Sequence, residues 1–174
     1  IILHAPMQRV WEVLLDPKLM SGCVPGVKSV DVISDDEYRA RMQVKISFIT
    51  ANFALHTRIV ERDPPRFLRA EGTGEDSAVA SSLKQSTEMH LFEHASGGTE
   101  MRLKVKVDVV GRIASFGLSA MKTKADRLWE EFGVNLNALL GKAEIFVAEK
   151  PPIAAATAQT LASVPSGARS GTKV

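Results

Sequence analysis

Few side chains in this sequence have the types and spacing that catalysis or metal binding requires. Cys23 is the single cysteine, and a thiol nucleophile needs a base within hydrogen-bond reach, which no nearby residue supplies. We therefore expect a small buried side chain in a turn. His90 and His94 have a spacing that would bring two imidazoles together on a helix, but here they straddle the end of a predicted strand. The sequence thus predicts neither a nucleophile nor a metal site.

Adjacent carboxylates occur twice, in Asp35-Asp36 and Glu130-Glu131. General acid–base catalysis needs one carboxyl whose pKa is raised by burial. The first pair falls in a loop and the second on the polar side of a predicted helix, so both are expected to be solvated. We predict no catalytic residue.

Alternating hydrophobicity predicts that residues 28–110 form an antiparallel sheet. In the clearest strand, apolar residues from Met101 to Val109 alternate with charged ones. The same alternation over residues 38–48 places Phe48 on the apolar side. Because each strand has one apolar and one polar side, we expect the sheet to be covered on one face only.

Helices are predicted at both ends of the domain. Two short ones, at about 6–15 and 17–22, precede the sheet, and a first strand is expected at or before residues 1–4. One long amphipathic helix is expected at about 113–140. Gly141 is its predicted end. A sheet crossed by one late helix predicts an α+β fold that encloses a space.

Composition limits the classes of partner. Residues 141–174 hold four basic and two acidic side chains, which leaves 18 of each sign in residues 1–140. A neutral domain disfavours a nucleic-acid surface. The lone cysteine predicts a reducing compartment, the cytoplasm. We expect one domain over residues 1–146 and a flexible tail rich in Pro, Ala and Ser over residues 147–174.

Four segments carry a resemblance to a known family: "APMQRVWEVLLDP" at 5–17, "CVPG" at 23–26, "VERD" at 60–63 and "VDVVGRIASFG" at 107–117. Together they resemble the CoxG family of carbon monoxide dehydrogenase subunits, within the START-like (SRPBCC) superfamily. The resemblance implies a helix-grip fold, in which a curved sheet wraps around the C-terminal helix. It also implies a non-catalytic accessory protein of a molybdenum hydroxylase of the carbon monoxide dehydrogenase type. Such proteins are linked to membrane recruitment of that enzyme and to quinone transfer.

Apolar pockets are lined mostly by large apolar side chains, so we expect a cavity between the sheet and the last helix to bind a quinone or a lipid. No intrinsic cofactor and no metal are expected. The predicted ligand-binding residues are Met42, Phe53, Leu55, Gly72, Met89, Val105, Phe116, Met121, Leu128 and Phe132. The alternative for the aromatic ones is that they only fill the core.

Two loops are expected to flank the mouth of this cavity, one with Cys23, Pro25 and Gly26 and one with Gly111 and Gly117. The glycines of the second loop have a competing interpretation as turn residues only. Two other functional classes stay open. One is a START-like cyclase or hydrolase, for which the inner face offers few polar groups beyond Thr57, Gln85 and Thr87. The other is a protein-interaction module with a filled core. Peripheral contact with the inner face of the cell membrane is also expected.

Overall fold

The computed structural model describes residues 1–148 and the side chains of residues 1–142. The predicted tail lies outside the described residues, apart from its first two. The elements follow the expected order: β1 (Ile2–Leu3), α1 (Met7–Leu15), α2 (Pro17–Cys23), β2 (Val27–Ser34), β3 (Glu37–Ile46), β4 (Ile49–Asp63), β5 (Phe67–Asp76), β6 (Ser81–Glu93), β7 (Thr99–Gly111), the 3-10 helix η1 (Arg112–Phe116) and α3 (Gly117–Ala148).

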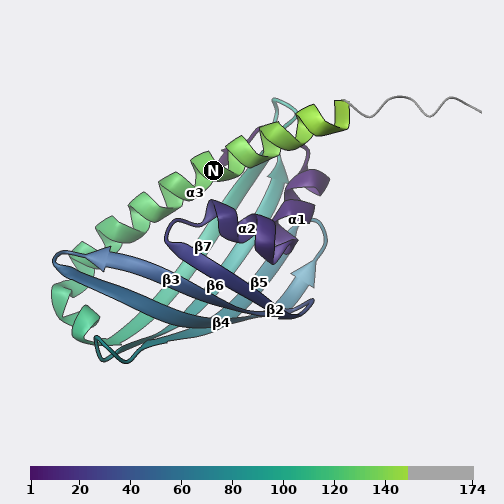
Figure 1. Ribbon diagram of the computed structural model, residues 1–174. Helices are drawn as coiled ribbons and strands as arrows, with labels where there is room; N and C mark the ends of the chain where they lie inside the picture. Colours follow the sequence, from purple (N-terminus) through teal and green to yellow (C-terminus); the bar gives the residue numbers. More distant parts are fainter. Residues whose placement is uncertain (149–174) are drawn as a thin grey trace, which may run out of the picture.

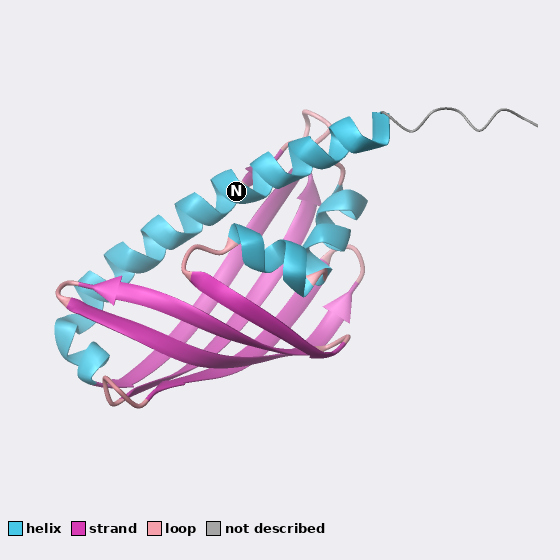
Figure 2. Ribbon diagram, in the orientation of Figure 1, coloured by secondary structure: helices cyan, strands magenta, loops and turns pink. Residues whose placement is uncertain are grey.

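A single seven-stranded antiparallel sheet forms the body of the domain. Its strand order is β1-β7-β6-β5-β4-β3-β2, so every neighbour from β2 to β7 is also a neighbour in the chain. The sheet curves, α3 runs across its concave side, and α1 and α2 lie on that same side (Figures 1 and 2). The expected α+β fold with one covered face is confirmed.

The break between the two short helices has a local cause. Pro17 cannot continue α1, and Asp16 adopts an extended conformation between the two helices. The Asp16 carboxylate then accepts hydrogen bonds from the backbone N–H groups of Lys18 and Leu19, at 2.9 and 3.1 Å. These bonds satisfy two of the free donors at the start of α2. The sequence therefore ends one helix and begins the next within two residues.

The long helix differs from its predicted limits at both ends. Residues 112–116 form a 3-10 turn, and α3 begins at Gly117. The prediction that Gly141 ends the helix is wrong, because α3 continues to Ala148. A glycine ends a helix by adopting a positive φ, and Gly141 is not among the glycines that do so. The residues after it, such as Lys142 and Ala143, favour helix.

The predicted place of Phe48 is also wrong. β3 ends at Ile46 and β4 begins at Ile49, so Ser47 and Phe48 form a two-residue turn. Ser47 has a φ of 54°, as tight hairpin turns require. The turn takes Phe48 out of the alternation, and 78% of this residue is exposed.

The interior of the domain contains two separate hydrophobic clusters. The larger one lies where α1, α2, β1 and the second half of α3 meet the adjoining ends of β6 and β7, and its members include Trp11, Leu91 and Leu136. The smaller one surrounds Phe53 and Ile113, at the β3–β4 hairpin and η1. These two clusters hold the opposite ends of the sheet against α3.

Candidate functional site

Between the two clusters, side chains that point toward α3 are only partly buried. Met42, Val105, Met121 and Leu128 are half-buried, and they belong to neither cluster within the described residues. Leu55, which packs on the smaller cluster, and Gly72 are also half-buried. These six predicted ligand-binding residues thus lie along one stretch of the inner face.

The other four predicted ligand-binding residues are placed differently. Met89 and Phe132 are buried in the larger cluster, and Phe53 is buried in the smaller one. Phe116 is half-buried and packs against the smaller cluster. Its ring also contacts the ring of Phe48 edge-on, at 5.6 Å. These four side chains therefore contribute to the two ends of the core.

Burial along α3 changes abruptly at Phe132. The inward stripe of the helix is half-buried at Met121, Ala125 and Leu128, and it is fully buried at Phe132, Leu136 and Leu140. Within the described part of the chain, only the second half of α3 is therefore packed tightly. The first half covers the sheet loosely.

Val107 shows the same looseness from the sheet side. It pairs with Gln85 and alternates with the buried Thr99 and Met101, so its side chain faces inward. Even so, 51% of Val107 is exposed. β1 covers β7 only at Thr99 and Glu100, which leaves this part of β7 at the edge of the sheet. The inner face is accessible to solvent at this edge.

One row across the inner face is partly polar. Tyr38, Thr57, Gly72, Gln85 and Val107 stand opposite one another on five successive strands. Burial raises the pKa of the Tyr38 phenol, and a hydrogen bond with Thr57 acts in the opposite direction. The phenol is thus neutral at physiological pH. The sequence indicated Thr57 and Gln85 as inward polar residues, but alternation alone placed Tyr38 among the apolar ones.

The two loops expected at the cavity mouth lie far apart. The carbonyl oxygen of Cys23 accepts a hydrogen bond from Asn135 in α3. Gly117 is the first residue of the same helix, so 18 residues separate the two contact points, about 27 Å along the axis. Pro25 and Gly26 follow α2 and are half-buried. The loops therefore stand at opposite ends of the loosely packed half of α3.

The glycines of the second loop satisfy a backbone requirement. Gly111 has a φ of 91° and Gly117 a φ of 82°, values that residues with a side chain rarely adopt. A Cβ on Gly111 would overlap the carbonyl oxygen of Ala80. These residues allow β7 to turn into η1 and α3.

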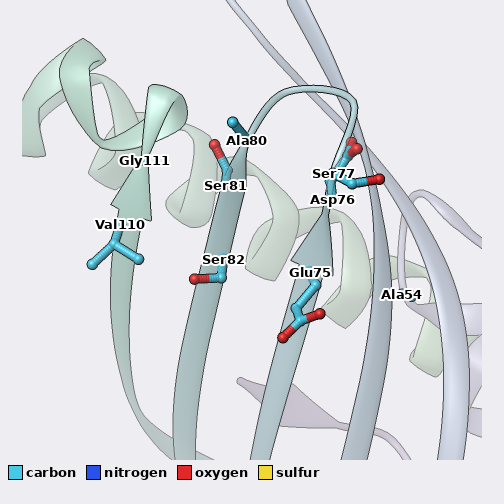
Figure 3. Close-up of a pocket in the computed structure, with 9 residues that line it drawn as sticks. All are labelled: Ala54, Glu75, Asp76, Ser77, Ala80, Ser81, Ser82, Val110 and Gly111. Carbon is cyan, nitrogen blue, oxygen red and sulfur yellow. The ribbon is translucent and has the colours of Figure 1, made fainter.

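Two shallow hollows lie on the convex side of the sheet. One, with a volume of about 360 Å³, lies over Gly72 and neighbouring outward side chains such as Arg58 and Lys84. The other has a volume of about 430 Å³ and surrounds the β5–β6 turn (Figure 3). It is lined by Ala54, Glu75, Asp76, Ser77, Ala80, Ser81, Ser82, Val110 and Gly111. Neither hollow includes the ligand-binding residues predicted on α3.

The remaining chemically active side chains are placed as isolated groups. Cys23 is buried in the larger cluster, and burial raises the pKa of its thiol. His90 lies beside Phe67 and Phe92 on the outer face, whereas His94 contacts Ser96 in a turn. Residues 1–148 contain no group of three His, Cys, Asp or Glu side chains placed to hold a metal ion. No helix in this region combines the length and apolar content needed to cross a bilayer.

A curved antiparallel sheet around a long C-terminal helix, preceded by two short helices, defines the START-like helix-grip class. A conserved protein from Geobacillus kaustophilus shares this fold with a TM-score of 0.76 and 22% identity, over 82% of this chain and 93% of that one. A protein from Thermus thermophilus aligns with a TM-score of 0.61 and 14% identity, over 82% and 94%. Ara h 8.0201 aligns with a TM-score of 0.55 and 11% identity, over the same shares. Among proteins with curated descriptions, none matches this sequence.

The sequence pattern of the CoxG family of carbon monoxide dehydrogenase subunits matches residues 2–141. The chain belongs to this family, and the resemblance seen in the sequence is confirmed. The matched range covers the sheet, both short helices and α3 as far as Gly141.

Proposed function

We propose that this protein is a non-catalytic accessory protein that binds a hydrophobic ligand, a quinone or a lipid, between the sheet and the first half of α3. The observation that carries this proposal is the half-exposed inner face between two buried clusters. Apolar surface left accessible inside a fold gains about 25 cal/mol per Å² when a ligand covers it. Val107, which faces inward and is 51% exposed, lies at the edge through which such a ligand would enter.

The family name supports the partner. A member of a carbon monoxide dehydrogenase subunit family that lacks catalytic groups of its own would act on behalf of the enzyme. We propose that it supports a molybdenum hydroxylase of the carbon monoxide dehydrogenase type, by delivering quinone or by recruiting the enzyme to the membrane. It would act in the cytoplasm, at the inner face of the cell membrane.

An exposed apolar tip supports the membrane contact. Phe48 is 78% exposed and Leu118 is 82% exposed, and Phe116, two residues before Leu118, contacts the Phe48 ring. Basic side chains, Lys45, Arg112 and Lys122, stand nearby in the chain and are exposed. Apolar residues beside basic ones are typical of surfaces that bind anionic membranes. Vesicles with phosphatidylglycerol should sediment the protein, whereas Phe48→Ser with Leu118→Ser should abolish the binding.

Extraction of the purified protein tests the ligand. Organic solvent should release a quinone or lipid in near-stoichiometric amount, detected by mass spectrometry and ultraviolet absorbance. Val107→Trp should exclude the ligand, because the new ring would occupy the accessible inner face. Val110→Trp, on the outer face of the same strand, is the matched control and should retain it. Equal ligand content in the two variants would contradict the proposed position.

A protein-interaction module is the second candidate, and one outer surface favours it. Phe67, His90 and Phe92 stack in succession, with centroid distances of 4.7 and 6.3 Å, and the Arg102 guanidinium lies 4.7 Å from the Phe92 ring. Aromatic and arginine side chains are enriched at protein interfaces. If extraction and reconstitution with quinone and lipid both gave no bound ligand, this candidate would replace the first.

A further inference from the structure

We infer that Thr57 and Gln85 form a hydrogen-bonding site for a neutral oxygen atom of the ligand. This inference rests on the proposed function and narrows its ligand class. The ligand would be an apolar molecule that carries a carbonyl or hydroxyl oxygen, as opposed to a hydrocarbon without polar atoms or a molecule with a charged head group.

The two side chains converge above Gly72. Gly72 pairs with Thr57 on one side and with Gln85 on the other. A Cβ at Gly72 would lie 3.1 Å from Thr57 Oγ1 and 3.0 Å from Gln85 Nε2. Both polar atoms therefore border the same point, where the glycine provides no side chain to fill the space. An oxygen atom of a ligand can approach both from the α3 side.

Thr87 fixes the orientation of the Gln85 amide. The hydroxyl of Thr87 donates a hydrogen bond to Gln85 Oε1 at 2.9 Å. The acceptor end of the amide is thus engaged, and Nε2 is the end that lies near Gly72. Within residues 1–148, Nε2 has no hydrogen-bond acceptor, and Gln85 is half-buried, so solvent now satisfies this donor.

The surroundings explain why a polar group here would select among ligands. The next row toward η1 contains Ala40, Leu55, Gly74, Leu83 and Val109 and is apolar throughout. A ligand that covers this face displaces the water from Gln85 Nε2. If the ligand has no acceptor oxygen, the donor stays unpaired, which weakens binding about 10- to 100-fold.

The charge of the row excludes an ionic head group. Tyr38 is its only ionisable side chain, and it is neutral at physiological pH. On the rest of the inner sheet face, Asp76 carries a carboxylate, but its oxygens already accept hydrogen bonds from the N–H groups of Asn52 and Ala78. No cation in the row could balance a phosphate or a carboxylate, so a neutral oxygen fits the site better.

Two probes with the same carbon skeleton test this inference. Menadione carries two carbonyl oxygens on a methylnaphthalene frame, and 2-methylnaphthalene carries none. We expect the full-length protein to bind menadione at least 10-fold more tightly in calorimetry, after correction for water–octanol partition. Gln85→Leu and Thr57→Val should each lower menadione affinity several-fold and leave the affinity for 2-methylnaphthalene unchanged or higher. Ser86→Ala, on the outer face of the same strand, should change neither.

The outcomes separate this inference from the proposed function. If both probes bind with equal affinity and Gln85→Leu changes neither, the polar site is wrong and the hydrophobic site stands. If neither probe binds, both are wrong. Circular dichroism and the melting temperature identify a variant that does not fold. In that event Gln85→Glu, which replaces the donor by a carboxylate of similar shape, provides a second test and should also reduce menadione affinity.

Discussion

Asn135 of α3 donates a hydrogen bond from Nδ2 to the carbonyl oxygen of Cys23, 3.1 Å away and 112 positions earlier in the chain. Asn137 donates to the carbonyl oxygen of Ile2 and accepts from the backbone N–H of His4, each at 2.9 Å. These bonds fasten the second half of α3 to the N-terminal segment. In the described residues no such bond joins residues 117–131 to the sheet, so the first half is held by side-chain packing.

Removal of the Asn135 amide should destabilise the fold measurably. A partly buried hydrogen bond contributes about 1 kcal/mol, so Asn135→Ala should lower the melting temperature by about 2–4 °C. Glu131→Ala, which truncates an exposed side chain one turn earlier, should change the free energy of unfolding by less than about 0.5 kcal/mol. Equal effects of the two substitutions in urea unfolding would show that the Asn135–Cys23 bond contributes nothing.

The two glycines before α3 should differ in their tolerance of alanine. Both have a positive φ, which disfavours alanine by about 1 kcal/mol. A Cβ at Gly111 would also overlap the Ala80 carbonyl oxygen, whereas a Cβ at Gly117 has no neighbour within 4 Å. Gly111→Ala should therefore lower the free energy of unfolding by at least about 2 kcal/mol more than Gly117→Ala. Similar values for the two in denaturant titrations would contradict this prediction.

Apolar truncations along α3 should have contrasting effects. Leu136 is fully buried in the larger cluster, so Leu136→Ala should lower the free energy of unfolding by about 2–5 kcal/mol. Leu118 is 82% exposed, and Leu118→Ala should change it by less than about 0.5 kcal/mol. Thermal unfolding of the two variants under identical conditions measures the difference. A large loss at Leu118 would mean that the first turn of α3 is packed.

Tyr38 should make the stability of the domain sensitive to alkali. Burial raises the pKa of its phenol, so the folded state disfavours the phenolate more than the unfolded state does. This contribution to stability is fully present below the ordinary tyrosine pKa of about 10 and is lost as the pH rises through the higher folded-state pKa. Above pH 10, Tyr38→Phe should therefore lose stability less steeply than the wild type. Parallel slopes would show that the phenol has the same pKa in both states.

Cys23 should react slowly while the protein is folded. The thiol is buried, its Sγ lies 3.6 Å from the carbonyl oxygen of Leu19, and burial raises its pKa, so little thiolate forms at neutral pH. Modification by Ellman's reagent should become at least about 100-fold faster in a concentration of urea that unfolds the protein. A fast reaction of the folded protein would place the thiol at an accessible position.

Alternation in the sequence predicted the order of the strands and the side of each residue, because a strand repeats every two residues. It could not predict the depth of burial. Val107 and Met101 lie on the same side of β7, yet only Met101 is buried, since burial depends on where α3 and β1 cover the sheet. Phe48 was misplaced because a two-residue turn interrupts the alternation without a glycine or proline to mark it. Gly141 was misplaced because a glycine permits a helix end but does not require one.

The separation of the two hydrophobic clusters has a consequence for cooperativity. Each cluster stabilises one end of the sheet, and the partly buried stretch between them connects these ends mainly through backbone hydrogen bonds. We expect amide protons near Leu91 and those near Phe53 to exchange through different opening reactions in the empty protein. A ligand that binds only the native state would raise both opening free energies together. An occupied domain would then open as one unit, and hydrogen exchange would detect the ligand far from the atoms it touches.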